Sequence, residues 1–148
     1  MTNINPYLNF EGNCEEAMNF YRSVFGGDFA GPIMRWGEMP GCDEGEMNLS
    51  EDDKGKVMHM CLPISDGSFI MASDSLKGFG PPCIQGNNVT VAIGLGSREE
   101  ADRLFAGLSA GGTVQMPMED AFWGGYFGSF VDKFGINWLI NADVSGEK

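Results

Sequence analysis

The only histidine of the chain, His59, is the residue whose chemistry is simplest to anticipate. A neutral imidazole can act as an acid, a base or a hydrogen-bond donor near pH 7. Alternation along residues 57–64 puts His59 on one strand face with Val57, Cys61 and Pro63. Two interpretations stay open, a catalytic or ligand-binding histidine and a hydrogen-bonded structural one, because one His without a paired carboxylate is a weak catalytic signal.

Two further segments carry groups that suit a binding site. Asp74 closes the run Met71-Ala72-Ser73-Asp74, where it could orient a polar ligand or His59, or cap its own turn. Residues 119–126 place two carboxylates before Phe122, Trp123, a Gly pair and Tyr126. This order suits the rim of a pocket that stacks a planar ligand, and it suits an aromatic corner facing the core equally well.

The composition argues against several other functions. The 148 residues include 21 Asp and Glu against 9 Lys and Arg, and the basic residues are scattered, so no electrostatic footprint for nucleic acid is expected. One histidine leaves little room for a zinc site or a His-based triad. Four cysteines lack any Cys-x-x-Cys pair and are expected to be reduced thiols: Cys14, Cys42, Cys61 and Cys83.

The length and hydrophobic content predict one compact domain, residues 1–148. No apolar run approaches the roughly 20 residues that span a bilayer, and residues 1–5 show no signal-peptide pattern. We therefore expect a cytoplasmic protein that does not enter the membrane.

An internal repeat identifies the elements that must position these side chains. The segment that starts Glu15-Glu16-Ala17 and ends Gly26-Gly27 is echoed by one that starts Glu99-Glu100-Ala101 and ends Gly111-Gly112. Each copy predicts an amphipathic helix, the first capped by Asn13 with Glu16 and the second by Ser97 with Glu100.

Alternating apolar residues predict strands around both helices. They precede the helices at 4–10 and 89–95, and they follow at 29–35, 57–64, 68–73, 113–118, 126–131 and 136–141. A tight turn, Ser65-Asp66-Gly67, joins the strands 57–64 and 68–73. The sequence thus predicts an α+β fold of two βαβββ modules, residues 3–76 and 89–142, with a linker at 77–88.

Residues 36–56 interrupt the first module with Gly, Pro and seven carboxylates. The acidic spacing is not that of an EF-hand, so we expect a solvated surface loop and not a calcium site. These carboxylates are Glu38, Asp43, Glu44, Glu46, Glu51, Asp52 and Asp53.

An ordered series of motifs accompanies the module plan: Tyr7-Leu8-Asn9-Phe10, Gly12-Asn13-Cys14-Glu15-Glu16-Ala17, Met58-His59, Phe122-Trp123-Gly124 and Asp132-Lys133-Phe134-Gly135. Together they resemble the vicinal oxygen chelate superfamily, which includes glyoxalase I, extradiol dioxygenases and bleomycin-resistance proteins. Within the superfamily, the PhnB-like branch, sometimes labelled 3-demethylubiquinone-9 3-methyltransferase, is most similar. The resemblance implies a curved mixed sheet around a cavity, commonly completed by a homodimer.

In metal-using members the ligands come from the opening and closing strands of both modules. The matching places hold Asn5 or Tyr7, Met71 or Ala72, Thr90 or Ala92, and Asn137 or Leu139. None of these is His, Asp or Glu, so a divalent metal is possible but disfavoured, and no cofactor is expected. The methyltransferase label also fits poorly, because the junction Gly94-Leu95-Gly96-Ser97 belongs to a repeat module.

Carried onto this chain, the resemblance implies a cavity with an apolar lining and few hydrogen-bonding groups. The expected ligand-binding residues are Tyr7, Asn9, His59, Met71, Asp74, Trp123, Tyr126 and Asn137. The favoured function is metal-independent binding of a small apolar or aromatic molecule. The alternative is a lyase or dioxygenase-like enzyme that uses His59 or a divalent metal, and a third possibility is a regulatory or scaffold protein.

Overall fold

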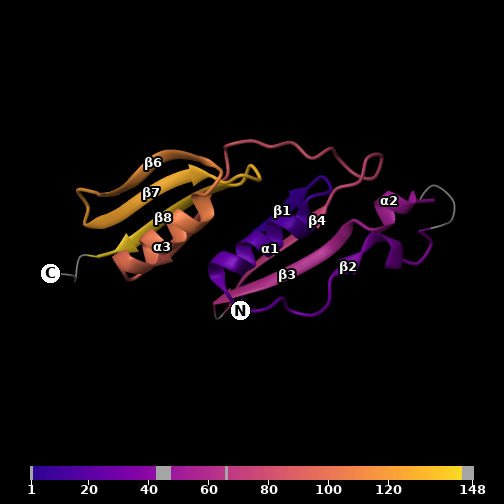
Figure 1. Ribbon diagram of the computed structural model, residues 1–148, viewed down its shortest axis with the longest axis horizontal. Coiled ribbons are helices and arrows are strands. Elements are labelled where there is room, and N and C mark those ends of the chain that lie inside the picture. The colour runs from indigo at the N-terminus through magenta and orange to yellow at the C-terminus, as the bar shows by residue number, and fades with distance from the viewer. Residues whose placement is uncertain (1, 43–47, 66, 145–148) are drawn as a thin grey trace. The chain divides into compact units, whose positions relative to one another are not determined.

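The computed structural model describes residues 2–42, 48–65 and 67–144. The chain divides into two compact units, one up to Ile84 and one from Gln85 onward (Figure 1). No helix of the described residues has the length and apolarity that crossing a membrane requires.

The first unit is a four-stranded mixed sheet with one long helix, α1 (Cys14–Phe25). The strand order is β1-β4-β3-β2, with β1 parallel to β4 and the other neighbours antiparallel. Short helices η1 (Trp36–Glu38) and α2 (Glu51–Lys54) lie between β2 and β3. The strands are β1 (Tyr7–Phe10), β2 (Met34–Arg35), β3 (Val57–Ser65) and β4 (Ser68–Asp74).

The second unit repeats this arrangement with strand order β5-β8-β7-β6 and the helix α3 (Arg98–Ser109). Strand β5 is parallel to β8, and the other neighbours are antiparallel. The strands are β5 (Val91–Leu95), β6 (Thr113–Asp120), β7 (Gly125–Val131) and β8 (Asn137–Asp143). The predicted α+β plan of two βαβββ modules is therefore confirmed.

Each long helix packs on one face of its own sheet (Figure 1). Helix α1 buries Ala17, Met18 and Tyr21 at helical spacing, and α3 buries Ala101, Leu104 and Leu108. Alternation sends every second strand residue toward the helix and the others to the opposite side. We call these the helix face and the open face of each sheet.

The cap of the second helix is confirmed, and that of the first is wrong. Ser97 accepts a hydrogen bond from the Glu100 amide at 3.1 Å. Asn13 makes no side-chain cap: it has φ −112° and ψ 20°, outside the extended conformation from which an N-cap side chain usually reaches the second or third amide of a helix. The first amide of the helix, that of Cys14, donates to the carboxylate of Asp74.

The strand predicted at 29–35 is reduced to β2, which has only two residues. Gly31 has φ +75°, and Pro32 has no amide hydrogen, so the segment cannot continue a sheet ladder. It makes a separate backbone hydrogen bond with β3, from the Ala30 amide to the Cys61 carbonyl. Residues 43–47 of the predicted acidic loop and Asp66 of the predicted turn lie outside the described residues, and they include the carboxylates Asp43, Glu44 and Glu46.

Candidate functional site

The open face of the first sheet carries His59. The register pairs Tyr7 with Met71 across β1 and β4, and Met71 with Cys61 across β4 and β3. Directly paired residues share a face, so these three side chains and His59, two residues before Cys61, lie on the same side of the sheet. Leu8, Met60, Leu62, Ile70 and Ala72 are buried on the helix face.

His59 is hydrogen-bonded on this face. The Tyr7 hydroxyl lies 3.1 Å from His59 Nδ1, and the two ring centroids are 5.7 Å apart. Both side chains are at least partly exposed, and Met34 on the neighbouring strand β2 is paired directly with His59. Nε2 makes no hydrogen bond to the described residues, so the contact fixes the ring through Nδ1 alone. Burial raises the pKa of the neighbouring Cys61 thiol.

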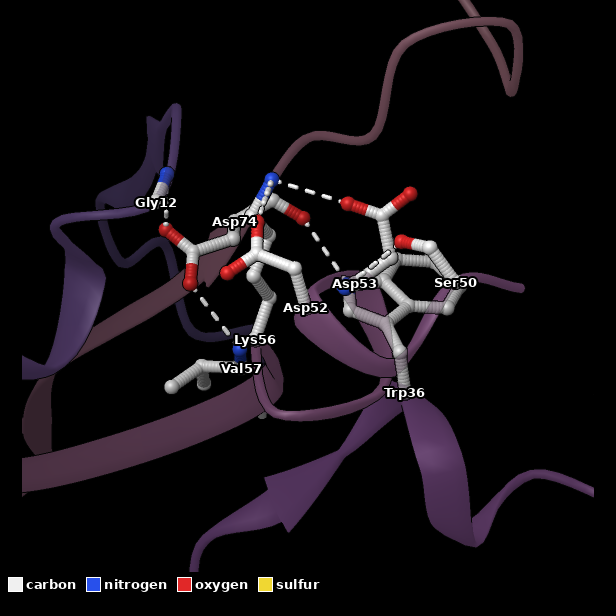
Figure 2. A network of polar contacts seen from close by, with 8 residues as sticks. All are labelled: Gly12, Trp36, Ser50, Asp52, Asp53, Lys56, Val57 and Asp74. Atoms are coloured by element: carbon white, nitrogen blue, oxygen red, sulfur yellow. Dashed lines mark hydrogen bonds and ion pairs between the residues drawn. The ribbon is translucent and has the colours of Figure 1, made fainter.

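Asp74 is a structural carboxylate of the helix face and is 2% exposed. Oδ1 accepts hydrogen bonds from the amides of Gly12 at 2.8 Å and Cys14 at 3.0 Å, and Oδ2 accepts one from Val57 at 2.9 Å. The Trp36 indole donates to the Asp74 backbone carbonyl at 3.0 Å (Figure 2). Asp74 therefore joins three separate segments, and it does not orient His59 on the opposite face.

The acidic groups of α2 lie beside this network (Figure 2). Lys56 Nζ is 2.8 Å from Asp53 and 3.6 Å from Asp52, and the hydrogen bond to Asp53 raises the pKa of Lys56. Ser50 caps the helix by accepting from the Asp53 amide. These pairs are surface ion pairs, which contribute little to stability. No three His, Cys, Asp or Glu side chains of the described part of the chain gather where they could hold a metal.

The open face of the second sheet has a pocket of about 420 Å³. The Trp123 and Phe127 rings meet there edge to face, with centroids 5.9 Å apart. An adjoining pocket of about 360 Å³ lies over β6 and shares the same two rings, with Phe122 at its border. The first pocket is lined by Ala92, Ile93, Gly94, Trp123, Phe127, Leu139 and Asn141.

Asn141 supplies the polar group of this pocket. Its Oδ1 is shielded from solvent and has no hydrogen-bond partner among the described residues. A Cβ at Gly125 would lie 2.8 Å from this oxygen and 2.5 Å from the Trp123 indole nitrogen. Because glycine has no Cβ, the Trp123 indole and the Asn141 side-chain amide can both lie close to the backbone at position 125.

Sequence reasoning missed Asn141, Phe127 and the role of Gly125. Asn141 was foreseeable in part, because it follows Asn137 and Leu139 at the two-residue spacing of one strand face. The sequence shows the Gly pair at 124–125, but it does not indicate which side chains occupy the space that a Cβ would fill. Tyr126 and Phe127 are adjacent on one strand and therefore point to opposite faces of the sheet, so only the residue on the open face can line the pocket.

Tyr126 lies on the helix face, contrary to its predicted place in the lining. Its hydroxyl donates to Asp102 on α3 at 2.6 Å, a contact that raises the pKa of Tyr126. Arg98 lies 4.7 Å above its ring. Asn137 donates from Nδ2 to the Gly86 carbonyl at 2.7 Å, so it anchors the chain that enters the second unit.

The predicted ligand-binding residues thus fall into separate groups. Tyr7, Asn9, His59 and Met71 belong to the open face of the first sheet. Trp123 belongs to the pocket of the second unit, while Asp74 and Tyr126 lie on helix faces. At the predicted metal places, Asn5 accepts a hydrogen bond from the Phe69 amide, and Ala72 is buried on the helix face.

Comparison with known proteins identifies the family. The family described as 3-demethylubiquinone-9 3-methyltransferase matches residues 2–141. Protein YjdN of Escherichia coli (strain K12) is 33% identical over 94% of this chain and 94% of its own length.

Solved structures agree with this match. Protein PA1353 of Pseudomonas aeruginosa has a TM-score of 0.79 at 35% identity, covering 97% of this chain and 98% of its own. A putative 3-demethylubiquinone-9 3-methyltransferase, PhnB protein, from Bacillus cereus has a TM-score of 0.70 at 28% identity, covering 95% and 99%.

The fold also extends to more distant proteins. A glyoxalase/bleomycin resistance protein from Albidiferax ferrireducens T118 has a TM-score of 0.62 at 16% identity, covering 93% of this chain and 95% of its own. With the two repeated βαβββ units, these matches show that the chain belongs to the PhnB-like family, described as 3-demethylubiquinone-9 3-methyltransferase, with the glyoxalase-like α+β fold.

Proposed function

We propose that the chain binds a small, flat, mostly apolar molecule without a metal, in the pocket on the open face of the second sheet. The observation that carries this proposal is the solvent-shielded Asn141 Oδ1, which has no partner among the described residues and lies beside two aromatic rings. A buried acceptor left unpaired costs about 1–3 kcal/mol, so a ligand that donates a hydrogen bond there recovers that free energy. Such an arrangement of apolar walls and one polar group is typical of ligand pockets.

The aromatic pair supports a planar ligand. Trp123 is 58% exposed, so its ring is available for stacking, and Phe127 meets it edge to face. The carboxylates nearby, Glu119 and Asp120, line the adjoining pocket, and Asp120 pairs with Arg98. A neutral ligand fits this setting better than an anion.

The methyltransferase in the family description has no support in the geometry. A methyl donor such as S-adenosylmethionine is generally bound at a Gly-rich turn of a parallel sheet, whereas both sheets here are mixed. The turn after β5 leads into a repeat-module helix capped by Ser97.

The binding test compares two probes, 2-naphthol and 2-methoxynaphthalene, by isothermal titration calorimetry. We expect the hydroxyl donor to bind about tenfold tighter, and we expect Asn141→Ala to remove that preference. Trp123→Ala should weaken both probes by about tenfold. Tyr126→Phe is the matched control, because it changes a helix-face aromatic residue and should leave both affinities unchanged.

Equal affinity of the two probes in the wild type, together with unchanged binding by Trp123→Ala, would contradict the proposed pocket. Metal independence has its own measurement. Dialysis against EDTA should leave probe affinity unchanged, and stoichiometric Ni, Zn, Mn or Fe in the purified protein would contradict a metal-free site.

A second candidate function is supported by the Tyr7 contact with His59. An imidazole held through Nδ1 keeps Nε2 for proton transfer, as an acid or base of a lyase or dioxygenase-like enzyme requires. The test is turnover of glyoxalase-type substrates such as the methylglyoxal–glutathione hemithioacetal. Loss of turnover in His59→Gln, with folding retained, would favour this function, whereas absence of turnover in the wild type would reject it for that substrate.

A homodimer and a cytoplasmic location accompany the proposed function. Exposed apolar side chains on and beside β6 support an interface, since patches of this kind mark contact surfaces. They are Val114, Met116, Phe122 and Trp123. The four cysteines are free thiols, which are typical of a reducing compartment. Light scattering should give twice the chain mass of 16.0 kDa.

A further inference from the structure

Four side chains that can bind a metal lie on the open face of the first sheet. His59 and Cys61 are two residues apart on β3 and point to the same side. Met34 on β2 is directly opposite His59, and Met71 on β4 is directly opposite Cys61. Cβ atoms of directly opposed residues are about 4.5–5.5 Å apart, and those two apart on a strand are about 7 Å apart. The four side chains therefore occupy one small patch.

The chemistry of this donor set is selective. Thiolate and thioether ligands select copper(I), zinc and iron–sulfur clusters, and imidazole suits zinc, copper, iron and nickel, whereas carboxylates and carbonyls suit Mg²⁺, Ca²⁺ and Mn²⁺. Two thioethers beside one thiol and one imidazole favour copper(I) within this group. The open-face positions of β1, β3 and β4 hold no carboxylate in the described strands: Tyr7, Asn9, His59, Cys61, Pro63, Phe69, Met71 and Ser73. A hard cation would have no charged ligand at this patch.

The Tyr7 contact matches the second shell of a metal-bound histidine. Ligating histidines bind the metal through one ring nitrogen and hydrogen-bond through the other, which fixes the ring orientation. The Tyr7 hydroxyl lies 3.1 Å from Nδ1, so when Nδ1–H donates to the tyrosine oxygen, the lone pair of Nε2 would be the one that binds a metal. Methionine side chains are unbranched and flexible, so Met34 and Met71 can reach a shared ion from opposite sides of β3.

We propose that His59 and Cys61, with Met34 and Met71, form a binding site for one copper(I) ion, and that Tyr7 is the positioning residue of His59. On binding, the Cys61 S–H bond breaks, the sulfur becomes the charged ligand of the metal, and the proton passes to solvent. Copper stays in the +1 state throughout, so no oxidant or reductant is consumed. This site is on the first sheet and does not rest on the pocket proposed for the second.

The test is anaerobic titration of the reduced protein with copper(I) against bicinchoninate as competing chelator. We expect one ion per chain and a new near-ultraviolet thiolate-to-copper absorption. Cys61→Ser should lower the affinity by more than about 100-fold, and Met71→Leu by about tenfold. Tyr7→Phe should lower it by about 10–100-fold, as loss of an outer-shell partner does.

Cys83→Ser is the matched control, because Cys83 is also partly buried and makes its hydrogen bond to the Asn9 carbonyl, outside the four-residue patch. It should leave copper affinity unchanged. X-ray absorption of the loaded protein should find one nitrogen and at least two sulfur neighbours, with the nitrogen lost in His59→Gln. Equal effects of Cys61→Ser and Cys83→Ser, or zinc binding as tight as copper(I) binding, would overturn the proposal.

Circular dichroism of each metal-free variant separates a lost ligand from a lost fold. Serine and leucine are close in size to the residues they replace, and all four positions are on an open face, so we expect unchanged spectra. If Cys61→Ser failed to fold, the absorption band and the stoichiometry of Met71→Leu and Tyr7→Phe would still decide the proposal.

Discussion

Replacing Asp74 by Asn isolates the charge of a buried carboxylate with almost no change of shape. In the native protein, Oδ1 serves Gly12 and Cys14, and Oδ2 serves Val57. Asn keeps one acceptor oxygen and brings an NH2 donor to the other position. If the oxygen stays with Gly12 and Cys14, the Val57 amide faces another donor, and the reverse orientation loses two bonds.

The expected loss of stability follows from these contacts. One hydrogen bond to a charged acceptor contributes about 1.5–3 kcal/mol, and donors left unpaired in the interior cost about 1–3 kcal/mol. We therefore expect Asp74→Asn to lower the free energy of unfolding by about 3–5 kcal/mol. This is a large part of the roughly 5–15 kcal/mol that stabilises a typical domain.

Urea denaturation followed by circular dichroism measures this loss, and amide hydrogen exchange localises it. Exchange at the Val57 amide should accelerate more than at buried amides of the second unit. Asp52→Asn is the control, because Asp52 is 90% exposed and 3.6 Å from Lys56, so it should change stability by less than about 0.5 kcal/mol. A loss below about 1 kcal/mol for Asp74→Asn would refute the structural role of the Asp74 hydrogen bonds and would reopen a role in ligand binding.

Three further outcomes are expected. Gly125→Ala should displace the Trp123 indole and weaken 2-naphthol about tenfold, whereas Gly96→Ala, whose Cβ would meet nothing within 4 Å, should not; equal effects would contradict the crowding. Ser97→Ala should cost about 1 kcal/mol by urea denaturation and Asn13→Ala almost nothing, since only the serine caps. Burial, with Asp74 and Glu15, raises the pKa of Cys14 to about 12 from 9.0. As the pH rises, the thiol therefore loses its proton in the unfolded chain before it does so in the folded one. The contribution of Cys14 to the free energy of unfolding is complete below pH 9 and falls by about 1.4 kcal/mol per pH unit until about pH 12. Cys14→Ala should reduce that alkaline slope, and an unchanged slope would contradict the shift.

The repeated modules were predictable because helical and strand periods alternate clearly along the chain. Ala17, Met18 and Tyr21 lie at helical spacing, and they are the residues that α1 buries. The strand predicted at 29–35 is mostly absent because Gly31, with its positive φ, and Pro32, which has no amide hydrogen, interrupt the ladder despite the apolar residues around them. The predicted cap at Asn13 is wrong because this residue does not adopt the extended backbone conformation of an N-cap, which the sequence pattern does not reveal.

The site was less predictable than the fold, since a side chain's face depends on tertiary register. Tyr126 and Phe127 are both aromatic and adjacent, and only the packing of α3 assigns Tyr126 to the helix face. Asp74 is of a residue type that often binds ligands, yet both oxygens of its carboxylate accept hydrogen bonds from backbone amides. The contact between Tyr7 and His59 joins residues 52 positions apart and required the order of β1, β4 and β3.

The buried aspartates of the two units have unequal consequences for folding. Asp132 in the second unit binds the amides of Phe134 and Ile136 and the Trp138 indole, at separations of 2, 4 and 6 residues. Asp74 binds amides 62, 60 and 17 residues away. Contacts that close short loops form earlier in folding than contacts that close long ones. During refolding, the hydrogen bonds of Asp132 in the second unit should therefore form before those of Asp74 in the first unit, although the ribosome synthesises the second unit last.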